Sequence, residues 1–267
     1  MAVIEPPIYS CVTRRSAFLR LWLLGLAGAA IAASEPLPKT LLLGAHLPEL
    51  AFRAVTFVNT ALLLAVLVGL GTVAAREVGL YSVFAPQVPI RGKTRDHVFH
   101  WVQAAILIGG AMGIAQILFD RWFWALIPAD QALLLRHAAQ LSATVPVARL
   151  MFQALTEELM LRWGLMSGLL WVLVLLFRQR PARPSAMIVW VAILGVCVLS
   201  VLGQMPAVLS AVSSDPSSIL LVRTMAISAF AGIAYGWLFW KHGLESAVLA
   251  HMIAQGGLIV FDGLSLF

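Results

Sequence analysis

Four ionisable residues in the second half of the chain interrupt long apolar runs. Glu157 and Glu158 are adjacent, Arg162 follows in the same run, and His251 lies in the last run before the C-terminus. If these runs lie in lipid, a charged side chain at their centre costs about 2.5–3.5 kcal/mol, so it must face a protein interior or a wet cavity. A carboxylate in such a cavity can be tuned towards neutral pH, where a general base works best.

Helix geometry predicts different surroundings for the two carboxylates. Glu158 and Arg162 are four residues apart, so they share a helix face and can form an ion pair. Glu157 points about 100° away from Glu158 and is left to take or give a proton in a cavity. Two plainer interpretations stay open. The Glu158–Arg162 pair could be only a staple between helices, and His251 only a hydrogen-bonded packing residue.

The composition predicts that lipid is the solvent of these runs. Of the 267 residues, 61% are hydrophobic and 11% are charged, whereas a soluble domain has about 25% charged and about 45–50% apolar residues. The net charge of +6 fits short basic loops beside a lipid bilayer. We expect no nucleic-acid partner, because no basic run lies over an aromatic platform. The fold class is therefore all-α, a polytopic transmembrane helical bundle of about seven or eight membrane helices.

The apolar runs predict membrane helices within a single domain, residues 1–267. They cover residues 16–33, 54–75, 101–119, 146–177, 185–203, 219–240 and 244–261. We expect interfacial segments at 121–128 and 130–141, a break at Pro206, a turn at 213–218 and a tight link at residues 241–243. The first run ends like a signal peptide, but Arg20 interrupts it, and we expect a retained helix.

The basic residues predict a cytoplasmic N-terminus. The positive-inside rule places on that side Arg14, Arg15, Arg20, Arg76, Arg91, Lys93, Arg95, Arg178, Arg180, Arg183 and Lys241. The depths of the site residues then disagree, since Glu157 is about 30 Å of helix from Arg178 and His251 only about 15 Å from Lys241. These residues can meet only if the helices tilt or break.

Two motifs resemble those of a known family. The run Glu157-Glu158-Leu-Met-Leu-Arg162 resembles the Glu-Glu-x-x-x-Arg signature of the CPBP (CAAX protease and bacteriocin-processing enzyme) family of intramembrane metalloproteases. Residues 232–251, with glycines in one helix, a short turn and His251 in the next, resemble its third motif. The resemblance covers a protease-like core at 146–255 and leaves 1–145 as family-variable N-terminal helices.

The resemblance implies a function and a site. The chain would be an integral protein of the bacterial plasma membrane, a metalloendopeptidase that hydrolyses a membrane-bound or lipidated peptide or protein substrate. Glu157 would be the general base that activates water, and Glu158, held by Arg162, would bind or orient. His251 would be a metal ligand or bind water. Zinc or another divalent metal would be the cofactor, with Glu158 and His251 as ligands.

The chain departs from the family pattern at two supporting positions. Gln204 stands where the second motif has a histidine, and Gln255 stands where the last motif usually has an asparagine. A glutamine is a poor zinc ligand, and a catalytic zinc usually has three protein ligands. A catalytically impaired relative, acting as a scaffold, chaperone or immunity protein, is therefore the alternative hypothesis. A small transporter with the carboxylates as a proton relay is the third.

Overall fold

The chain folds into a bundle of long helices, as predicted. The computed structural model describes residues 12–34, 48–86, 94–124, 126, 147–180, 184–211 and 218–265, and these residues contain helices and no strand. The helices are α1 (Arg14–Ala33), α3 (Glu49–Val78), α4 (Thr94–Trp124), α6 (Val147–Glu158), the π-helix η1 (Leu159–Met166), α7 (Ser167–Leu176), α8 (Ala186–Ala211), α9 (Ser218–His242) and α10 (Leu244–Ser265). The elements α6, η1 and α7 follow one another without a break.

The helices suit a bilayer by length and by surface. Five described segments are long and apolar enough to cross a membrane: Glu49–Val78, Val98–Phe123, Ala154–Leu176, Ala186–Gly203 and Leu221–His242. Large apolar side chains such as Leu62, Val66 and Leu107 are exposed on their outer faces, where lipid would cover them. The chain is therefore an integral membrane protein.

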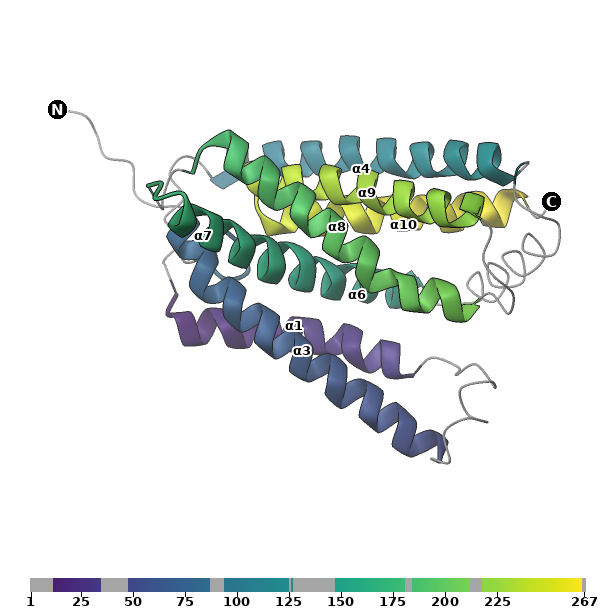
Figure 1. Cartoon of the computed structure of the whole chain (residues 1–267), viewed down its shortest axis with the longest axis horizontal. Helices are drawn as coiled ribbons and strands as arrows, with labels where there is room; N and C mark the ends of the chain where they lie inside the picture. The colour runs from purple at the N-terminus through teal and green to yellow at the C-terminus, as the bar shows by residue number, and fades with distance from the viewer. Residues whose placement is uncertain are drawn as a thin grey trace.

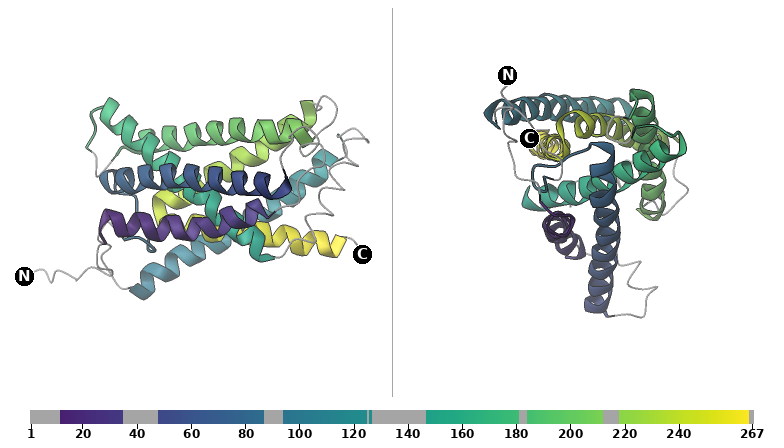
Figure 2. Two further views of the ribbon diagram at one scale, coloured as in Figure 1. Left: turned by 90° about the horizontal axis from the view of Figure 1, so that it is seen from below. Right: turned by 90° about the vertical axis from the view of Figure 1, so that its left-hand side faces the viewer.

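The segment α6–η1–α7 is the central helix of the bundle. It packs against α1 and α3 on one side and against α8, α9 and α10 on the other, and α4 covers α9 and α10 (Figure 1). Figure 2 shows α3 leaning away from the rest of the bundle at its N-terminal end. Of the most apolar 18 residues in each segment, half are buried in the central helix, against 17% in α3, α4 and α9. Of these five segments, the one that carries the signature residues is the most buried.

Two predicted boundaries are wrong, and two others lie outside the described residues. Pro206 does not break α8, which continues to Ala211, because transmembrane helices tolerate proline when neighbouring groups satisfy the freed backbone. The helix α4 runs on through Trp124, so the predicted interfacial segment begins as helix. The predicted segment 130–141 lies outside the described residues, as does most of the predicted turn at 213–218.

The link between α9 and α10 is tight and anchored, as its length predicted. Gly243 adopts a φ of 88° between the two helices, a left-handed conformation that favours glycine. The Leu244 N–H donates to the Tyr81 carbonyl at 3.2 Å. The buried Glu245 carboxylate accepts from the Ser82 hydroxyl at 2.6 Å and the Phe84 N–H at 2.9 Å. The segment after α3 therefore fixes the start of the helix that carries His251.

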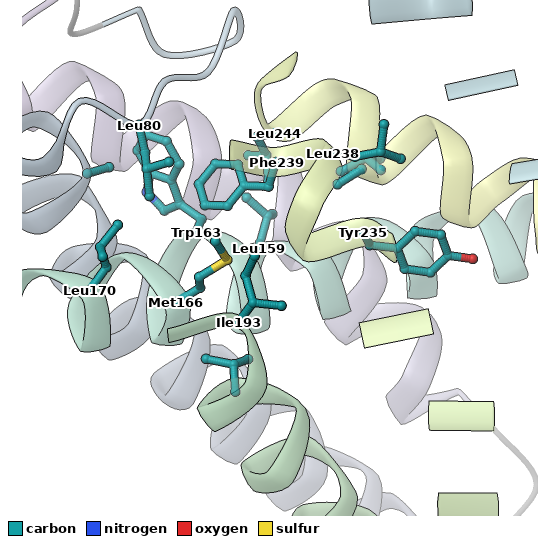
Figure 3. Close-up of a cluster of buried hydrophobic side chains, with 14 of the residues drawn as sticks. Leu80, Leu159, Trp163, Met166, Leu170, Ile193, Tyr235, Leu238, Phe239 and Leu244 are labelled. Atoms are coloured by element: carbon teal, nitrogen blue, oxygen red, sulfur yellow. The ribbon is translucent and has the colours of Figure 1, made fainter. Parts of the chain in front are cut away.

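The core is centred on an aromatic pair that joins the central helix to α9. Trp163 and Phe239 are fully buried, and their ring centroids are 6.3 Å apart. Leu159, Met166 and Leu170 surround them from the central helix, with Leu244 from α10 (Figure 3). The Trp163 indole donates to the Thr72 hydroxyl of α3 at 3.4 Å. This packing holds the helix of the two glutamates against the helix before His251.

Small residues allow α3 to approach the π-helix closely. A Cβ added at Gly71 would overlap the Trp163 carbonyl, and one added at Gly164 would lie 2.7 Å from the Leu67 side chain. In lipid the hydrophobic effect contributes little to the association of helices, so close backbone packing through small residues is a main source of it.

We expect Gly71→Ala to destabilise the protein by about 1–3 kcal/mol, because the added methyl group overpacks a backbone contact. The measurement is thermal unfolding of the purified protein in detergent. The matched control is Gly110→Ala in α4, where an added Cβ meets nothing within 4 Å. Equal unfolding temperatures for the two variants would contradict the close contact.

Candidate active site

One cavity in the described part of the bundle contains most of the predicted site residues. It has a volume of about 760 Å³ and lies between α3, α4, the central helix, α8, α9 and α10. Its polar lining residues are Gln116, Glu157, Glu158, Arg162, Ser200, Ser228, Tyr235, His251 and Gln255. The structure thus brings the adjacent glutamates, the arginine, the histidine and Gln255 together from two helices that are far apart in the sequence.

Glu158 is the buried centre of the cluster. Its side chain is 1% exposed, and its Oε1 atom accepts a hydrogen bond of 2.9 Å from His251 Nδ1. Its Oε2 atom lies 3.2 Å from Arg162 Nε in an ion pair whose angle is too poor for a hydrogen bond. A carboxylate this deeply buried is stable only when charged and hydrogen-bonding groups compensate it. Arg162 and His251 are these groups.

Arg162 is itself held by the backbone of α9. Its Nη2 atom donates to the carbonyl oxygens of Ala231 and Gly232 at 3.5 and 3.4 Å. A Cβ at Gly232 would lie 2.5 Å from the sulfur of Cys197, so the glycine also lets α8 pack here. The arginine therefore connects the central helix to α9 and orients the Glu158 carboxylate.

The π-helix begins directly after the glutamate pair. The π segment Leu159–Met166 carries Arg162, and the Ser167 hydroxyl donates to the Arg162 carbonyl at 3.4 Å. A π-helix is rare, usually a single turn, and often lies at a functional site. Its wider turn interrupts the regular α-helix at the level of the cavity. The signature itself thus contains a departure from regular α-helix geometry.

Glu157 has different surroundings from Glu158. Its side chain is 41% exposed and lines the cavity, with Oε2 3.9 Å from His251 Nε2. Because the Glu158 carboxylate can only accept, His251 Nδ1 donates the proton of this hydrogen bond. The Gln255 amide lies 3.4 Å from Nε2. The second ring nitrogen therefore faces Glu157 and the cavity.

The sequence prediction missed several cavity residues, among them Tyr235 and Gln116. The Tyr235 ring is stacked on the His251 imidazole with centroids 4.9 Å apart and planes 20° apart, and Gln116 lines the cavity from α4. Tyr235 lies inside the third motif, and Gln116 is a polar residue within an apolar run. These were the available signals, but neither predicted on its own which way the side chain would face.

Gln204 lies next to the cavity along α8. Leu199, Ser200 and Gly203 of that helix line the cavity, and residue 204 follows within the helix. The side chain of Gln204 lies outside the described part of the chain, so its supporting role stays a prediction.

The described residues do not fit a zinc site. No group of three or more His, Cys, Asp or Glu side chains among them could hold one metal ion, whereas a catalytic zinc usually has three protein ligands. Glu158 and His251 Nδ1 bind each other, and Arg162 holds the second Glu158 oxygen. His251 Nε2 and Glu157 Oε2 are left as an incomplete ligand set. The divalent metal stays a prediction, and no catalytic step is derived through it.

Fold and site define a class of protein: a helical integral membrane protein with a buried carboxylate–imidazole–guanidinium cluster beside a cavity. The family model described as Rce1-like, type II CAAX prenyl endopeptidase, matches residues 139–256. No curated protein and no solved structure matches the chain. Residues 139–256 therefore belong to the CPBP family that the motifs resemble, and this prediction is confirmed. At the level of the family, the match supports an intramembrane protease of the CAAX type.

We expect Arg162→Leu to destabilise the protein by about 3–5 kcal/mol, because it leaves the buried Glu158 carboxylate without its cation. Thermal unfolding in detergent measures the loss. Adding Glu158→Gln to Arg162→Leu should restore part of the stability, since no buried charge then remains. If the loss of stability in the double variant equals the sum of the losses in Arg162→Leu and Glu158→Gln, the pairing is contradicted.

Proposed function

We propose that the chain is an intramembrane endopeptidase in which Glu157 activates a water molecule for attack on a peptide bond. The observation that supports this is the 3.9 Å separation of Glu157 Oε2 and His251 Nε2 at the cavity. A water about 2.8 Å from each atom forms a bent bridge across such a gap. In the proposed reactive state the His251 ring is neutral, so both atoms are acceptors, and the water donates both of its protons to them and directs its lone pairs towards a substrate carbonyl.

The proposed reaction is a general base hydrolysis. Glu157 takes a proton from the water as the oxygen forms a bond to the carbonyl carbon, and the carbonyl oxygen becomes an oxyanion. The Gln255 amide lies beside this position and can donate a hydrogen bond to the oxyanion. The protonated Glu157 then gives its proton to the leaving nitrogen as the carbon–nitrogen bond breaks. Glu158 and Arg162 hold His251 throughout.

The cavity lining supports a substrate with a large apolar part. Leu63 and Leu67 of α3 and Leu161 and Leu165 of the central helix line the cavity beside the polar cluster. An apolar wall of this kind binds hydrocarbon, whereas a few polar groups orient the reacting bond. Together with the family match, this favours a membrane-associated substrate, with a prenylated peptide as the first probe.

The test of the proposed base is Glu157→Gln, assayed in liposomes with fluorogenic peptides that carry a farnesylated cysteine. We expect cleavage to fall by about 10²–10⁴-fold, because an amide does not accept the water proton. The matched control is Glu77→Gln, which removes an exposed carboxylate paired with Arg14 far along the sequence from the site. That variant should cleave as the unmodified chain does.

Unchanged cleavage in Glu157→Gln would reject Glu157 as the base. Cleavage of native membrane proteins is measured by comparing the new N-termini in cells with the unmodified chain and with Glu157→Gln. If the unmodified chain cleaves neither the farnesylated peptides nor any native membrane protein, the scaffold alternative is favoured. Unfolding temperatures of all variants are measured in the same detergent, so that misfolding is recognised.

Chelation tests whether the reaction needs a metal. Since the described donors do not fit zinc, we expect cleavage to survive EDTA and 1,10-phenanthroline within about twofold. The purified protein should also contain much less than one zinc per chain by mass spectrometry. Loss of activity on chelation, with recovery on adding zinc, would instead confirm the predicted metal. It would also make Gln204 the first residue to examine as a ligand.

A further inference from the structure

Tyr235 contacts both partners of the buried carboxylate. Its ring is stacked on His251 at 4.9 Å, and the guanidinium carbon of Arg162 lies over the same ring at 5.8 Å from its centroid. The tyrosine lies on α9, whereas Arg162 lies on the central helix and His251 on α10. One side chain from a third helix thus touches the two groups that hold Glu158.

The stack supplies a constraint that the hydrogen bonds lack. The bond from His251 Nδ1 to Glu158 holds one ring atom near the carboxylate, but a single hydrogen bond tolerates some rotation of the ring about its Cβ–Cγ bond. The contact with Gln255 is long, 3.4 Å, and weak by the usual criteria. A second aromatic plane 20° away fixes the orientation of the imidazole plane. The orientation of the plane determines whether Nε2 faces Glu157.

Tyr235 is itself held in place. It is 3% exposed and lies at the edge of the hydrophobic cluster, with its hydroxyl directed away from Trp163 and Phe239 (Figure 3). On the same helix, Gly232 and Gly236 contact α8 closely, since added Cβ atoms would lie 2.5 Å from Cys197 and 3.0 Å from Ile193. The backbone on either side of the tyrosine is therefore packed tightly, and its ring is a rigid support.

We propose that Tyr235 is a positioning residue whose ring holds the His251 imidazole so that Nε2 faces Glu157 and the reacting water. The proposal rests on the proposed function, because Nε2 matters for catalysis only if water is activated there. It assigns the role to the aromatic ring, not to the hydroxyl.

The kinetic test compares Tyr235→Leu, Tyr235→Phe and Phe230→Leu in the full-length protein, with farnesylated fluorogenic peptides in liposomes. Tyr235→Leu should lower kcat by about tenfold or more with KM within about twofold, because misorientation affects the reacting groups more than substrate binding. Tyr235→Phe keeps the ring and should restore kcat. Phe230→Leu removes an exposed aromatic ring of the same helix that lies against Phe119 and not against the cluster, and it should leave kcat unchanged.

A second measurement does not depend on cleavage. Histidine labelled with ¹⁵N in the ring, in detergent-solubilised full-length protein, reports the hydrogen bond at His251 Nδ1 by NMR, and loss of the signal in His251→Gln assigns it. Tyr235→Leu should shift or broaden this signal, whereas Tyr235→Phe and Phe230→Leu should preserve it.

Unchanged His251 signals in Tyr235→Leu, or a Tyr235→Phe as damaging as Tyr235→Leu, would overturn the positioning role. If the unmodified chain cleaves no probe, the proposed function fails. The NMR comparison then still decides whether Tyr235 orients the imidazole.

Discussion

The structure depends on one constraint, the burial of an ionised carboxylate inside a helical membrane bundle. Glu158 is almost fully buried, with Arg162 on one oxygen and His251 on the other. An uncompensated charge at this depth would cost more free energy than most of the surrounding contacts supply. This cluster joins three helices. The central helix supplies the carboxylate and the guanidinium, α10 supplies the imidazole, and α9 supplies the carbonyl groups that accept from the arginine. Disrupting any of these partners leaves a buried polar group without compensation.

The π-helix and the glycine contacts make this arrangement sterically feasible. The regular helix changes to π geometry immediately after Glu158, and close backbone contacts at Gly71 and Gly164 bring α3 against that segment. On the other side, Trp163 packs on Phe239 of α9. The anchored turn at Gly243 and Glu245 then sets the start of α10 relative to the segment after α3. The cluster is thus positioned from both sides by packing that involves no catalytic group.

The two adjacent glutamates differ in their surroundings. Glu158 is buried between Arg162 and His251, whereas Glu157 is partly exposed, with its Oε2 atom 3.9 Å from His251 Nε2. The proposed function assigns the exposed carboxylate to proton exchange and the buried one to orienting the histidine. Because Glu158 and His251 bond to each other, they also make a poor pair of metal ligands. The proposed hydrolysis consequently relies on carboxylate and imidazole acceptors around one water molecule.

The sequence by itself determined the helical membrane fold, most of the helix positions, the family and the short list of polar residues, because apolar run length and misplaced charges are local properties. The i,i+4 spacing also predicted the Glu158–Arg162 pair. It did not determine that α8 continues through Pro206, that a π-helix follows Glu158, or that Tyr235 stacks on His251. The helix-rise arithmetic placed Glu157 and His251 at different depths, whereas in the structure both line one cavity. These features depend on contacts between helices that are distant in the chain, so only the tertiary structure decided them.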